Sequence, residues 1–332
     1  MTSNQEAEMR RFVVVGGAGF IGGHFVETLL AREGTERVTV YDNFSSGRRW
    51  HLAGVADDPR LDVVVGEVGD LDQLAATVTG HDTVIHLASN PDIAAAVTNP
   101  AIDFDQGTVL THHVAEAARR GGVRLVLYAS GSGIYGDLGE VAAAEDHGPL
   151  VPVSTYGASK LAGEALLSSY AYMFGISARC FRFGNVVGPR QTHGVGYDFV
   201  RRLIADPTRL RILGDGRQSK SYVYVSDVIA AVLTAAEQVR DPFAVFNVAT
   251  EDYITVTEIA ELAMEVLALP DGSTTLEYTG GDRGWKGDVP VVRLNSERIR
   301  ALGWKNERSC REALRDSLAA MVVDARQGRF DE

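Results

Sequence analysis

Residues 11–30 constrain the fold of this chain more than any other stretch. Near their start, at 13–15, lie three consecutive valines, a run typical of a buried parallel strand, and the stretch continues with apolar residues at helical spacing. Between the two lie Gly17, Gly19 and Gly22, which have the spacing G-x-G-x-x-G. The stretch therefore predicts a strand that passes through a glycine turn into a helix.

This turn is suited to a dinucleotide. In the G-x-G-x-x-G motif the first glycine permits the tight turn, the second lets backbone N–H groups approach a pyrophosphate, and the third lets the helix lie close to the sheet. A second strand, predicted at 37–41, ends in Asp42, 20 residues after Gly22. A carboxylate at that place accepts hydrogen bonds from the adenosine ribose and repels a 2′-phosphate, so we expect NAD rather than NADP.

Strand and helix patterns alternate through the first half of the chain. Such alternation predicts the α/β class, with a Rossmann-type, doubly wound parallel sheet and helices on both of its faces. The predicted strands are 11–16, 37–41, 61–66, 82–87, 124–129 and 177–182, and the predicted helices are 20–32, 70–79, 104–120 and 156–174. One further helix, 227–239, and one further strand, 244–248, are expected to join the sheet.

The pattern becomes irregular after about residue 183, with loops that carry glycine and proline. We therefore expect an NAD-binding Rossmann domain at 11–185 that is rejoined by about 223–251. Residues 186–222 and 252–332 are expected to form a smaller α/β substrate-binding lobe over the carboxyl ends of the strands, where ligands of such sheets lie. Residues 1–10 are expected to be a disordered tail.

Charge and composition argue against several classes of protein. The net charge of −12 argues against a nucleic-acid partner and against a basic membrane-surface protein. The two cysteines, Cys180 and Cys310, have no metal-type spacing, so neither a disulfide framework nor a metal site is expected. The longest apolar runs are strand-sized and residues 1–10 are polar, which favours a cytoplasmic protein without a membrane partner.

The ends of the predicted strands supply further residues for NAD. The loop 43–47 after the second strand either contacts the adenosine or is an ordinary polar turn. Glu67 ends the third strand near the expected adenine, and Asp70 is expected to cap the next helix. His86 ends the fourth strand and is expected to be a core histidine. The residues predicted to contact the cofactor are Gly16, Gly19, Phe20, Ile21, Gly22, Asp42, Asn43, Ser45, Gly47, Glu67, Val68, Leu87, Ala88 and Ser89, together with Tyr156 and Lys160.

A tyrosine and a lysine four residues apart open the helix predicted at 156–174. Side chains at i and i+4 share one face of a helix, so Tyr156 and Lys160 are expected to be neighbours. An ammonium beside a phenol stabilises the phenolate, and so does an oxidised nicotinamide, which predicts a Tyr156 pKa well below its ordinary value of roughly 10. The alternative is a partly exposed helical pair without a role. After a dinucleotide fold, the pair predicts a general base.

With these motifs in place, the chain resembles the extended short-chain dehydrogenase/reductase family, and within it the nucleotide-sugar 4-epimerases of the UDP-glucose 4-epimerase type. The resemblance covers essentially the whole chain. It implies tightly held NAD that is reduced and reoxidised within each turnover, a UDP-sugar substrate, and a homodimer paired through the helices at 104–120 and 156–174. The segments that carry it are Gly-Gly-Ala-Gly-Phe-Ile-Gly at 16–22, Tyr-Asp-Asn-Phe-Ser-Ser-Gly at 41–47, His-Leu-Ala-Ser at 86–89, Tyr-Gly-Ala-Ser-Lys at 156–160, Phe-Gly-Asn-Val-Val-Gly-Pro-Arg at 183–190, Gly-Asp-Gly-Arg-Gln-Ser-Lys-Ser-Tyr-Val-Tyr-Val at 214–225 and Asp-Arg-Gly-Trp-Lys-Gly-Asp-Val-Pro at 282–290.

The resemblance also implies roles for single residues. Tyr156 would take the proton of the sugar 4-hydroxyl as the C4 hydride passes to NAD, and Lys160 would bind the nicotinamide ribose and lower the tyrosine pKa. The 4-keto sugar would swing about its diphosphate and regain hydride on its other face, which inverts C4. Lys220 stands where many relatives have an arginine, and a lysine holds phosphate with less geometric control. The residues at substrate-binding positions of the family are Asn185, Lys220, Tyr222, Arg283 and Asp288.

The loop 128–136 departs from the family pattern at Gly131, where relatives place a serine that hydrogen-bonds the reacting 4-oxygen. The hydroxyl that hydrogen-bonds the 4-oxygen must then come from Ser132, which is our leading candidate, from Ser130 or from water. The remaining alternative is that no hydroxyl takes this role. Gly131 and Gly133 also leave room beside the sugar, so Gly131 is counted among the substrate-binding residues. UDP-glucuronic acid, which is larger at C6, would fit this room as well as UDP-glucose does, with its carboxylate on backbone N–H groups and serine hydroxyls.

Four functions stay open at this point. The leading one is an NAD-dependent UDP-hexose 4-epimerase acting on UDP-glucose/UDP-galactose or on UDP-glucuronic acid/UDP-galacturonic acid. The alternative enzymes are a nucleotide-sugar dehydratase and a nucleotide-sugar decarboxylase. Dehydratase relatives carry an Asp-Glu pair in this loop, and decarboxylating relatives carry a glutamate at the Gly133 site. The loop of this chain has neither the Asp-Glu pair nor the glutamate. The alternative of another class is a non-catalytic NAD-binding sensor, against which the intact pair of Tyr156 and Lys160 weighs. A second departure, Gly107 in place of a frequent asparagine, predicts only the loss of one hydrogen bond.

Overall fold

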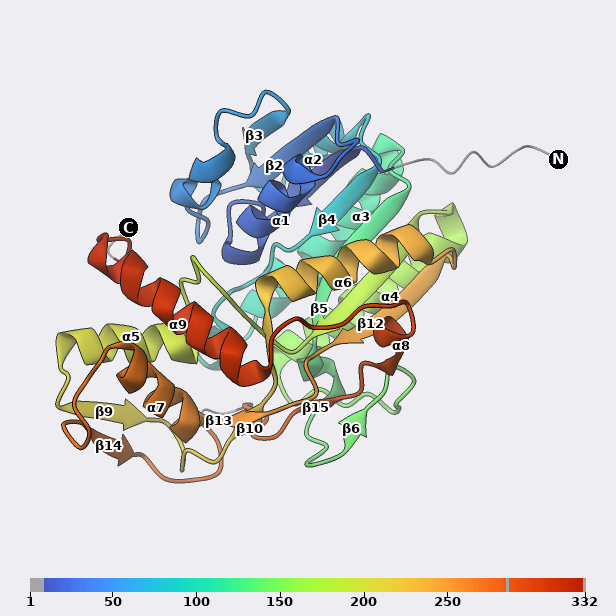
Figure 1. The fold of residues 1–332 in the computed structure, drawn as a ribbon. Helices are drawn as coiled ribbons and strands as arrows, with labels where there is room; N and C mark the ends of the chain where they lie inside the picture. Colours follow the sequence, from blue (N-terminus) through green and yellow to red (C-terminus); the bar gives the residue numbers. More distant parts are fainter. Residues whose placement is uncertain (1–8, 285–286, 331–332) are drawn as a thin grey trace.

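The computed structural model describes residues 9–284 and 287–330 of the chain. Its centre is a sheet of seven parallel strands in the order β12-β7-β5-β4-β1-β2-β3 (Figure 1). The order reverses between β1 and β4, which is where ligands of such sheets bind. The strands are β1 Arg11–Val15, β2 Arg37–Asp42, β3 Leu61–Val65, β4 Thr83–His86, β5 Leu125–Gly131, β7 Ser177–Phe183 and β12 Phe243–Val248. Most of the predicted tail at 1–10 lies outside the described residues, as do Trp285 and Lys286 within the motif at 282–290.

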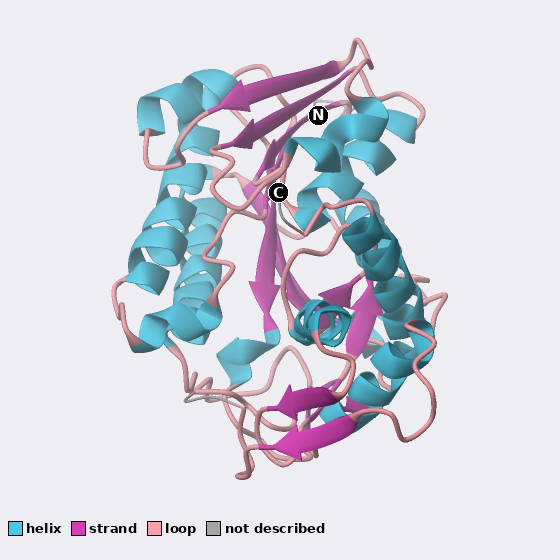
Figure 2. Ribbon diagram, turned by 90° about the vertical axis from the view of Figure 1, so that its left-hand side faces the viewer, coloured by secondary structure: helices cyan, strands magenta, loops and turns pink. Residues whose placement is uncertain are grey.

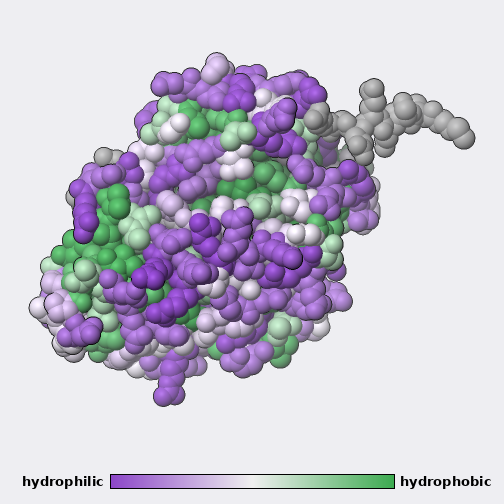
Figure 3. Space-filling view, in the orientation of Figure 1, coloured by the Kyte–Doolittle hydropathy of each residue, from purple (hydrophilic) through white to green (hydrophobic). Residues whose placement is uncertain are grey.

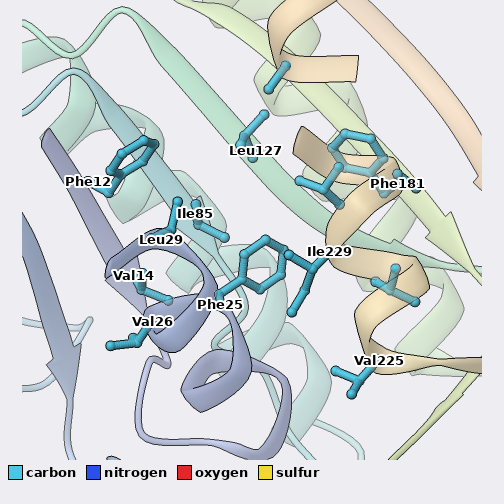
Figure 4. Close-up of a cluster of buried hydrophobic side chains, with 14 of the residues drawn as sticks. Phe12, Val14, Phe25, Val26, Leu29, Ile85, Leu127, Phe181, Val225 and Ile229 are labelled. Atoms are coloured by element: carbon cyan, nitrogen blue, oxygen red, sulfur yellow. The ribbon is translucent and has the colours of Figure 1, made fainter. Parts of the chain in front are cut away.

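Helices cover both faces of the sheet, as Figure 2 shows edge-on. The helices α1 Phe20–Ala31 and α6 Val225–Gln238 pack on one face, and part of this first core is drawn in Figure 4. The helices α2 Leu71–Val78, α3 Leu110–Gly121 and α4 Thr155–Phe174 enclose a second core on the other face. Along β1, Phe12 and Val14 belong to the first core, whereas Val13 and Val15 belong to the second. From Phe12 to Val15 the strand is apolar because both of its faces are buried there.

Side-chain caps define where two of these helices begin. Asp70 accepts a hydrogen bond from the Gln73 N–H at 3.0 Å, which confirms the predicted cap of α2. Ser154 accepts a hydrogen bond from the Gly157 N–H at 3.1 Å, so that α4 begins at Thr155. The shorter helical segments are η1 Arg49–Val55, η2 Ile93–Val97, η3 Phe104–Val109 and η4 Ser132–Tyr135, of which η3 is a π-helical turn that contains Gly107.

A smaller lobe follows the sheet and lies below it in Figure 1. Its core forms between α5 Val195–Ala205, α7 Val256–Val266 and α9 Cys310–Arg326. Capping boxes at Thr255 and Ser309 begin α7 and α9. The remaining strands form short pairs, namely β8 Asn185–Val187 with β11 Tyr222–Tyr224, β9 Arg209–Ile212 with β14 Thr275–Tyr278, β10 Ser219–Lys220 with β13 Ile254–Thr255, and β6 Ala142–Ala143 with β15 Arg293–Leu294.

The structure confirms the predicted Rossmann-type sheet, including the late helix and strand that join it. The division into two domains stays a prediction, and one segment differs from it. The helix α8 Glu297–Arg300 was expected in the lobe, yet Ile299 and Trp304 lie in the first core of the sheet. Trp304 donates from Nε1 to the Asp227 carbonyl of α6 at 2.8 Å, which holds this segment on the Rossmann side.

The face of the molecule seen in Figure 3 is mostly polar. Hydrophilic residues cover most of the face seen in Figure 3, with smaller hydrophobic patches between them. Within residues 9–284 and 287–330, no helix is long and apolar enough to cross a membrane. The same residues contain no group of three or more His, Cys, Asp or Glu side chains suited to a metal ion.

Candidate functional site

The glycine turn after β1 has space for backbone only. Gly16 has a φ of 81°, and a Cβ there would lie 2.8 Å from the Ala88 nitrogen. A Cβ on Gly22 would overlap the Gly16 carbonyl oxygen and would lie 2.6 Å from the Gly17 Cα. No described side chain caps the start of α1 at Gly19, so the first N–H groups of the helix are available to an anion. The turn therefore fits the pyrophosphate of the predicted dinucleotide.

Asp42 ends β2 beside this turn. Its carboxylate accepts hydrogen bonds from the Ala18 N–H at 2.9 Å and from the Phe44 N–H at 2.8 Å. Burial raises the pKa of Asp42, and these two hydrogen bonds oppose the rise. Each carboxylate oxygen has a second lone pair, so the group can accept ribose hydroxyls as well. The residue therefore fits its predicted role.

The loop after β2 folds back onto Asp42 and onto the end of β3. Asn43 donates from Nδ2 to Glu67 Oε2 at 3.0 Å, and its Oδ1 accepts from the Ser45 N–H at 2.9 Å. Gly47 packs so closely that a Cβ there would lie 2.8 Å from Asp42 Oδ1. The residues predicted for the adenosine side of the site thus lie together, and their contact with NAD stays a prediction.

The end of β4 passes the other side of the turn. The N–H groups of Leu87 and Ala88 both donate to the Val15 carbonyl, at 2.9 and 3.1 Å. Val68 and His86 are buried behind them; the His86 Nε2 lies 3.1 Å from the Thr111 hydroxyl. Burial lowers the pKa of His86 to about 3, so the ring is neutral. This confirms the prediction of a core histidine.

Tyr156 and Lys160 lie on one face of α4, as their spacing predicts. Lys160 Nζ donates to the Ala129 carbonyl at 2.8 Å and lies 5.4 Å from the centroid of the Tyr156 ring. The ring of Tyr128 lies on its other side, 5.1 Å from Nζ. Lys160 is 3% exposed, whereas Tyr156 is half-buried. An ammonium has three donors, so two of those on Lys160 can serve a ribose.

Burial sets the proton affinity of this pair. It raises the pKa of Tyr156 to about 12 and lowers that of Lys160 to about 8. In the protein by itself, desolvation of the phenolate opposes the predicted lowering of the phenol pKa, which also depends on an oxidised nicotinamide beside the ring. The Ser89 hydroxyl lowers the pKa of Tyr156, and the Asp103 carboxylate raises it. Additional positive charge at the site is needed to bring the phenol within reach of neutral pH.

The loop between β5 and η4 carries the residues predicted to supply a second hydroxyl. A Cβ on Gly131 would lie 3.8 Å from Tyr156 Cε1, so position 131 faces the tyrosine ring without a side chain. Ser130 is buried and donates to Glu164 Oε1 at 2.6 Å, which argues against its predicted role at the sugar. Ser132 lines a shallow hollow with residues of β15, and its role stays a prediction.

A buried ion pair holds this loop from behind. Arg182 donates to both carboxylate oxygens of Glu164, at 3.0 and 2.8 Å, and to the Tyr135 hydroxyl at 2.7 Å. The Tyr135 hydroxyl in turn donates to Asn247 Oδ1 at 2.8 Å. Together with the bond from Ser130, the network joins β5, α4, β7, β12 and η4. It fixes both ends of the loop that faces Tyr156.

Three predicted substrate residues of the lobe form one charged cluster. Lys220 Nζ pairs with Asp288 Oδ1 at 2.7 Å. Arg283 donates to the Asp288 carbonyl and to Asp137 Oδ2, both at 2.6 Å. Since Asp137 follows η4, the cluster is tied to the loop that faces Tyr156.

The two other predicted substrate residues, Asn185 and Tyr222, are not part of this charged cluster. Asn185 begins β8 and donates from Nδ2 to the Ser221 carbonyl at 3.3 Å. Tyr222 is 7% exposed, and its ring lies in the core of the lobe. This burial argues against the predicted contact of the Tyr222 ring with a sugar.

One buried carboxylate beside the site was not predicted. Asp103 is 1% exposed; its Oδ1 accepts from Asn90 Nδ2 at 3.0 Å and its Oδ2 accepts from the Thr155 hydroxyl at 2.7 Å. It therefore ties the segment after β4 to the start of α4. The sequence around Asp103, directly before η3, gives no signal for this role, because only the fold brings its two partners together.

The whole chain is similar to known nucleotide-sugar enzymes. Residues 12–249 match the model of the NAD dependent epimerase/dehydratase family. A UDP-glucose 4-epimerase from Mycolicibacterium smegmatis is 32% identical over 311 residues, which cover 92% of this chain and 96% of that protein. A solved UDP-galactose 4-epimerase is 36% identical with a TM-score of 0.84, covering 95% of this chain and 99% of its own. A dTDP-glucose 4,6-dehydratase from Streptomyces venezuelae, solved with NAD bound, is 27% identical with a TM-score of 0.86, covering 96% of this chain and 98% of its own.

Proposed function

The chain belongs to the NAD dependent epimerase/dehydratase family of nucleotide-sugar enzymes, and on this premise we propose that it is a UDP-hexose 4-epimerase. The observation that carries the proposal is the loop 131–133. This Gly-Ser-Gly segment faces Tyr156 at position 131 and has no carboxylate. Removing water or CO₂ from a sugar needs an added acid or base beside the tyrosine, whereas inverting C4 does not.

The residues of the site have separate tasks in this proposal. Bound NAD supplies the acceptor and donor of the C4 hydride and, when oxidised, a positive charge. The glycine turn would hold the pyrophosphate, Asp42 the adenosine ribose, and Lys160 the other ribose through the donors that Ala129 does not use. Tyr156 would take the proton of the sugar 4-hydroxyl and return it to the same oxygen after inversion. Because one proton and one hydride leave C4–OH and both return, substrate and product have equal mass.

The reaction type is tested by the mass of the product. The purified protein is incubated with a panel of UDP-sugars, and the products are separated by chromatography and weighed by mass spectrometry. We expect an epimer with the mass of its substrate. Loss of water would indicate a dehydratase and loss of CO₂ a decarboxylase, and either result would overturn the proposal.

The substrate is proposed to be either a neutral UDP-hexose or a UDP-uronic acid. A Cβ on Gly131 would meet nothing within 3.5 Å, so the loop leaves room beside the tyrosine for a carboxylate at C6. Backbone N–H groups and the Ser132 hydroxyl would be its partners. Turnover of UDP-glucose and UDP-glucuronic acid at equal concentration separates the two. Equal or higher activity on UDP-glucose removes the uronic acid from consideration.

Tyr156→Phe tests the general base. The substitution removes only the hydroxyl, so we expect NAD to stay bound and turnover to fall by about 10²- to 10⁴-fold. Turnover is measured with the best UDP-sugar of the panel, and NAD is measured as nucleotide released on denaturation. Tyr278→Phe, on exposed β14 of the lobe, is the matched control. If Tyr156→Phe keeps the activity of the wild type, the general base is another residue. If the wild-type protein binds NAD but converts no UDP-sugar, the result favours a non-catalytic NAD-binding sensor.

We further propose that the protein is a cytoplasmic homodimer paired through α3 and α4. The end of α4 exposes three large side chains, Tyr172, Met173 and Phe174, at 72, 71 and 48%. Contiguous exposed apolar residues favour an interface between proteins. Light scattering coupled to size-exclusion chromatography should give twice the chain mass, and Met173→Glu should shift it toward the monomer.

A further inference from the structure

Arg190 joins the smaller lobe to the Rossmann side of the molecule. It lies in the loop 188–194 between β8 and α5, and its side chain is 14% exposed. The guanidinium donates to both carboxylate oxygens of Glu27, each at 2.6 Å, to the His51 carbonyl at 2.8 Å and to His24 Nδ1 at 2.9 Å. One side chain of the loop is therefore bound to both α1 and η1.

The backbone of Arg190 shows how firmly this loop is held. Its φ of 66° lies in the left-handed region, which residues other than glycine rarely adopt. Such a conformation persists only where the surrounding contacts determine it. The loop is also bound on its lobe side, because the Ser317 hydroxyl of α9 accepts from the Gly188 N–H at 3.0 Å and donates to the Gly188 carbonyl at 3.1 Å. The loop thus connects α9 with α1 and η1 through bonds at both of its ends.

Two side chains of α1 hold the loop on the Rossmann side. A guanidinium only donates, so His24 accepts from Arg190 at Nδ1 and donates from Nε2 to the Pro189 carbonyl at 2.9 Å. This tautomer needs a neutral ring; burial and the charge of Arg190 both lower the pKa of His24. Glu27, three residues further along the helix, supplies the counter-charge of Arg190. Because α1 begins directly after the glycine turn, these contacts also fix the direction in which the start of the helix points.

His51 extends the contact from Arg190 to the glycine turn itself. Its ring is fully buried, and its Nδ1 donates to the Ala18 carbonyl at 2.6 Å. Burial lowers the pKa of His51 to about 4, so the ring is neutral. The Arg48 N–H donates to the same carbonyl at 2.8 Å, while the Ala18 N–H donates to Asp42 at 2.9 Å. Both peptide groups of Ala18 are therefore fixed, and Arg190 binds the residue that lies behind one of them.

We propose that Arg190 is a positioning residue that keeps NAD bound. It acts through His51 and α1, which hold the glycine turn in the shape suited to a pyrophosphate, and it ties the smaller lobe to that turn. A turn that is already ordered binds its ligand without the cost of ordering it. The inference goes beyond the proposed function, because retention of NAD does not depend on which reaction the site catalyses.

Arg190→Met keeps the length of the side chain and removes the guanidinium. The protein with its NAD is diluted into ethanol and alcohol dehydrogenase, and the NADH formed from released NAD is followed by absorbance. We expect NAD release to be about tenfold faster or more, because hydrogen bonds to charged groups are lost. Arg190→Lys keeps the charge without the paired donors and should give an intermediate rate. Arg315→Met is the matched control, since it breaks a 2.6 Å contact with Glu265 inside the lobe and should leave the rate unchanged.

Substitutions of His51 test the path from Arg190 to the turn while Arg190 stays in place. His51→Leu fills a similar volume without a donor, whereas His51→Asn keeps an N–H close to the position of Nδ1. We expect faster NAD release from His51→Leu and a rate near that of the wild type from His51→Asn. When His51→Leu and Arg190→Met are combined, the rate should rise by less than the product of the two single effects, because both break one path.

A general loss of stability would not produce this pattern. Circular dichroism with NAD in excess shows whether each variant is folded, and if Arg190→Met is not, Arg190→Lys and the two His51 variants decide the question. Excess NAD should also restore much of any activity that Arg190→Met loses. The inference is overturned if the folded Arg190 variants release NAD at the wild-type rate, if Arg315→Met speeds release as much, or if His51→Asn releases NAD as fast as His51→Leu.

The release assay needs no turnover, which keeps this inference separate from the proposed function. If the wild type epimerises no UDP-sugar, the proposed function fails, while faster release from Arg190→Met still supports the role of Arg190. An unchanged rate of release overturns that role even in an active epimerase.

Discussion

Glu164→Gln tests the buried ion pair behind the candidate site. Arg182 and Glu164 are 4 and 5% exposed and share two hydrogen bonds of 3.0 and 2.8 Å. The substitution keeps the shape of the side chain but leaves the guanidinium buried without its counter-charge. Breaking such a pair costs about 3–5 kcal/mol. Because the new amide oxygen can still accept one bond from Arg182, we place the loss of unfolding free energy near the lower value, about 3 kcal/mol.

The loss is measured by urea unfolding with NAD held in excess in every sample. Asp62→Asn is the matched control, since Asp62 pairs with Arg37 at the surface, where the two side chains are 49 and 54% exposed. Such an exposed pair contributes about 0–1 kcal/mol. A change below about 1 kcal/mol for Glu164→Gln, at an unchanged dependence on urea, would refute the reasoning that this pair is desolvated and bound on both oxygens.

Three further predictions address NAD, substrate and pH. Gly22→Ala places a Cβ against the Gly16 carbonyl, so the purified protein should contain little NAD when bound nucleotide is released by denaturation and measured. Gly69→Ala is the control, because nothing lies within 4 Å of a Cβ at position 69, and it should contain as much NAD as the wild type. Lys220→Ala leaves Asp288 without its 2.7 Å partner. It should raise KM for the UDP-sugar about tenfold or more, with a smaller effect on kcat. Lys220→Arg keeps the positive charge and should keep KM low. Burial lowers the pKa of His86 from 6.5 to about 3, so below pH 6.5 the unfolded chain binds a proton that the folded chain does not bind. The free energy of unfolding should therefore fall as the pH drops below 6.5. Urea unfolding at several pH values should show a smaller fall for His86→Phe than for the wild type.

The fold could be predicted from sequence because its signals are local. Apolar strands, helical spacing and the glycine turn at 16–22 each fall within about 20 residues, and parallel topology follows from their alternation. The predicted cap at Asp70 depends on a neighbour three residues away, and the structure confirms it. The spacing of Tyr156 and Lys160 likewise decides that they share a face of α4.

Contacts between distant segments could not be predicted in the same way. Whether Ser130 or Ser132 faces a sugar depends on where Glu164 and Arg182 lie, and these residues come from α4 and β7. Asp103 gains its role only because Asn90 and Thr155 meet at one carboxylate. From sequence we expect the segment around Trp304 to lie in the lobe, because it follows lobe residues along the chain. In the structure, however, the Trp304 indole donates a hydrogen bond to the carbonyl of Asp227 in α6.

Burial and oxidised NAD act in opposite directions on the pKa of Tyr156, and this has a consequence for the proposed reaction. Burial raises the pKa of Tyr156 to about 12, so in the protein alone the phenol is protonated at neutral pH, and it lowers the pKa of Lys160 to about 8, at which the ammonium is still the main form at pH 7. In the proposed reaction, the phenol would become a base only with a further positive charge beside it, which oxidised NAD would supply. Without that charge, Tyr156 would favour its protonated form and would hold the proton taken from the sugar. The burial of Tyr156 would thus couple the movement of this proton to that of the hydride, as a reaction without net oxidation requires.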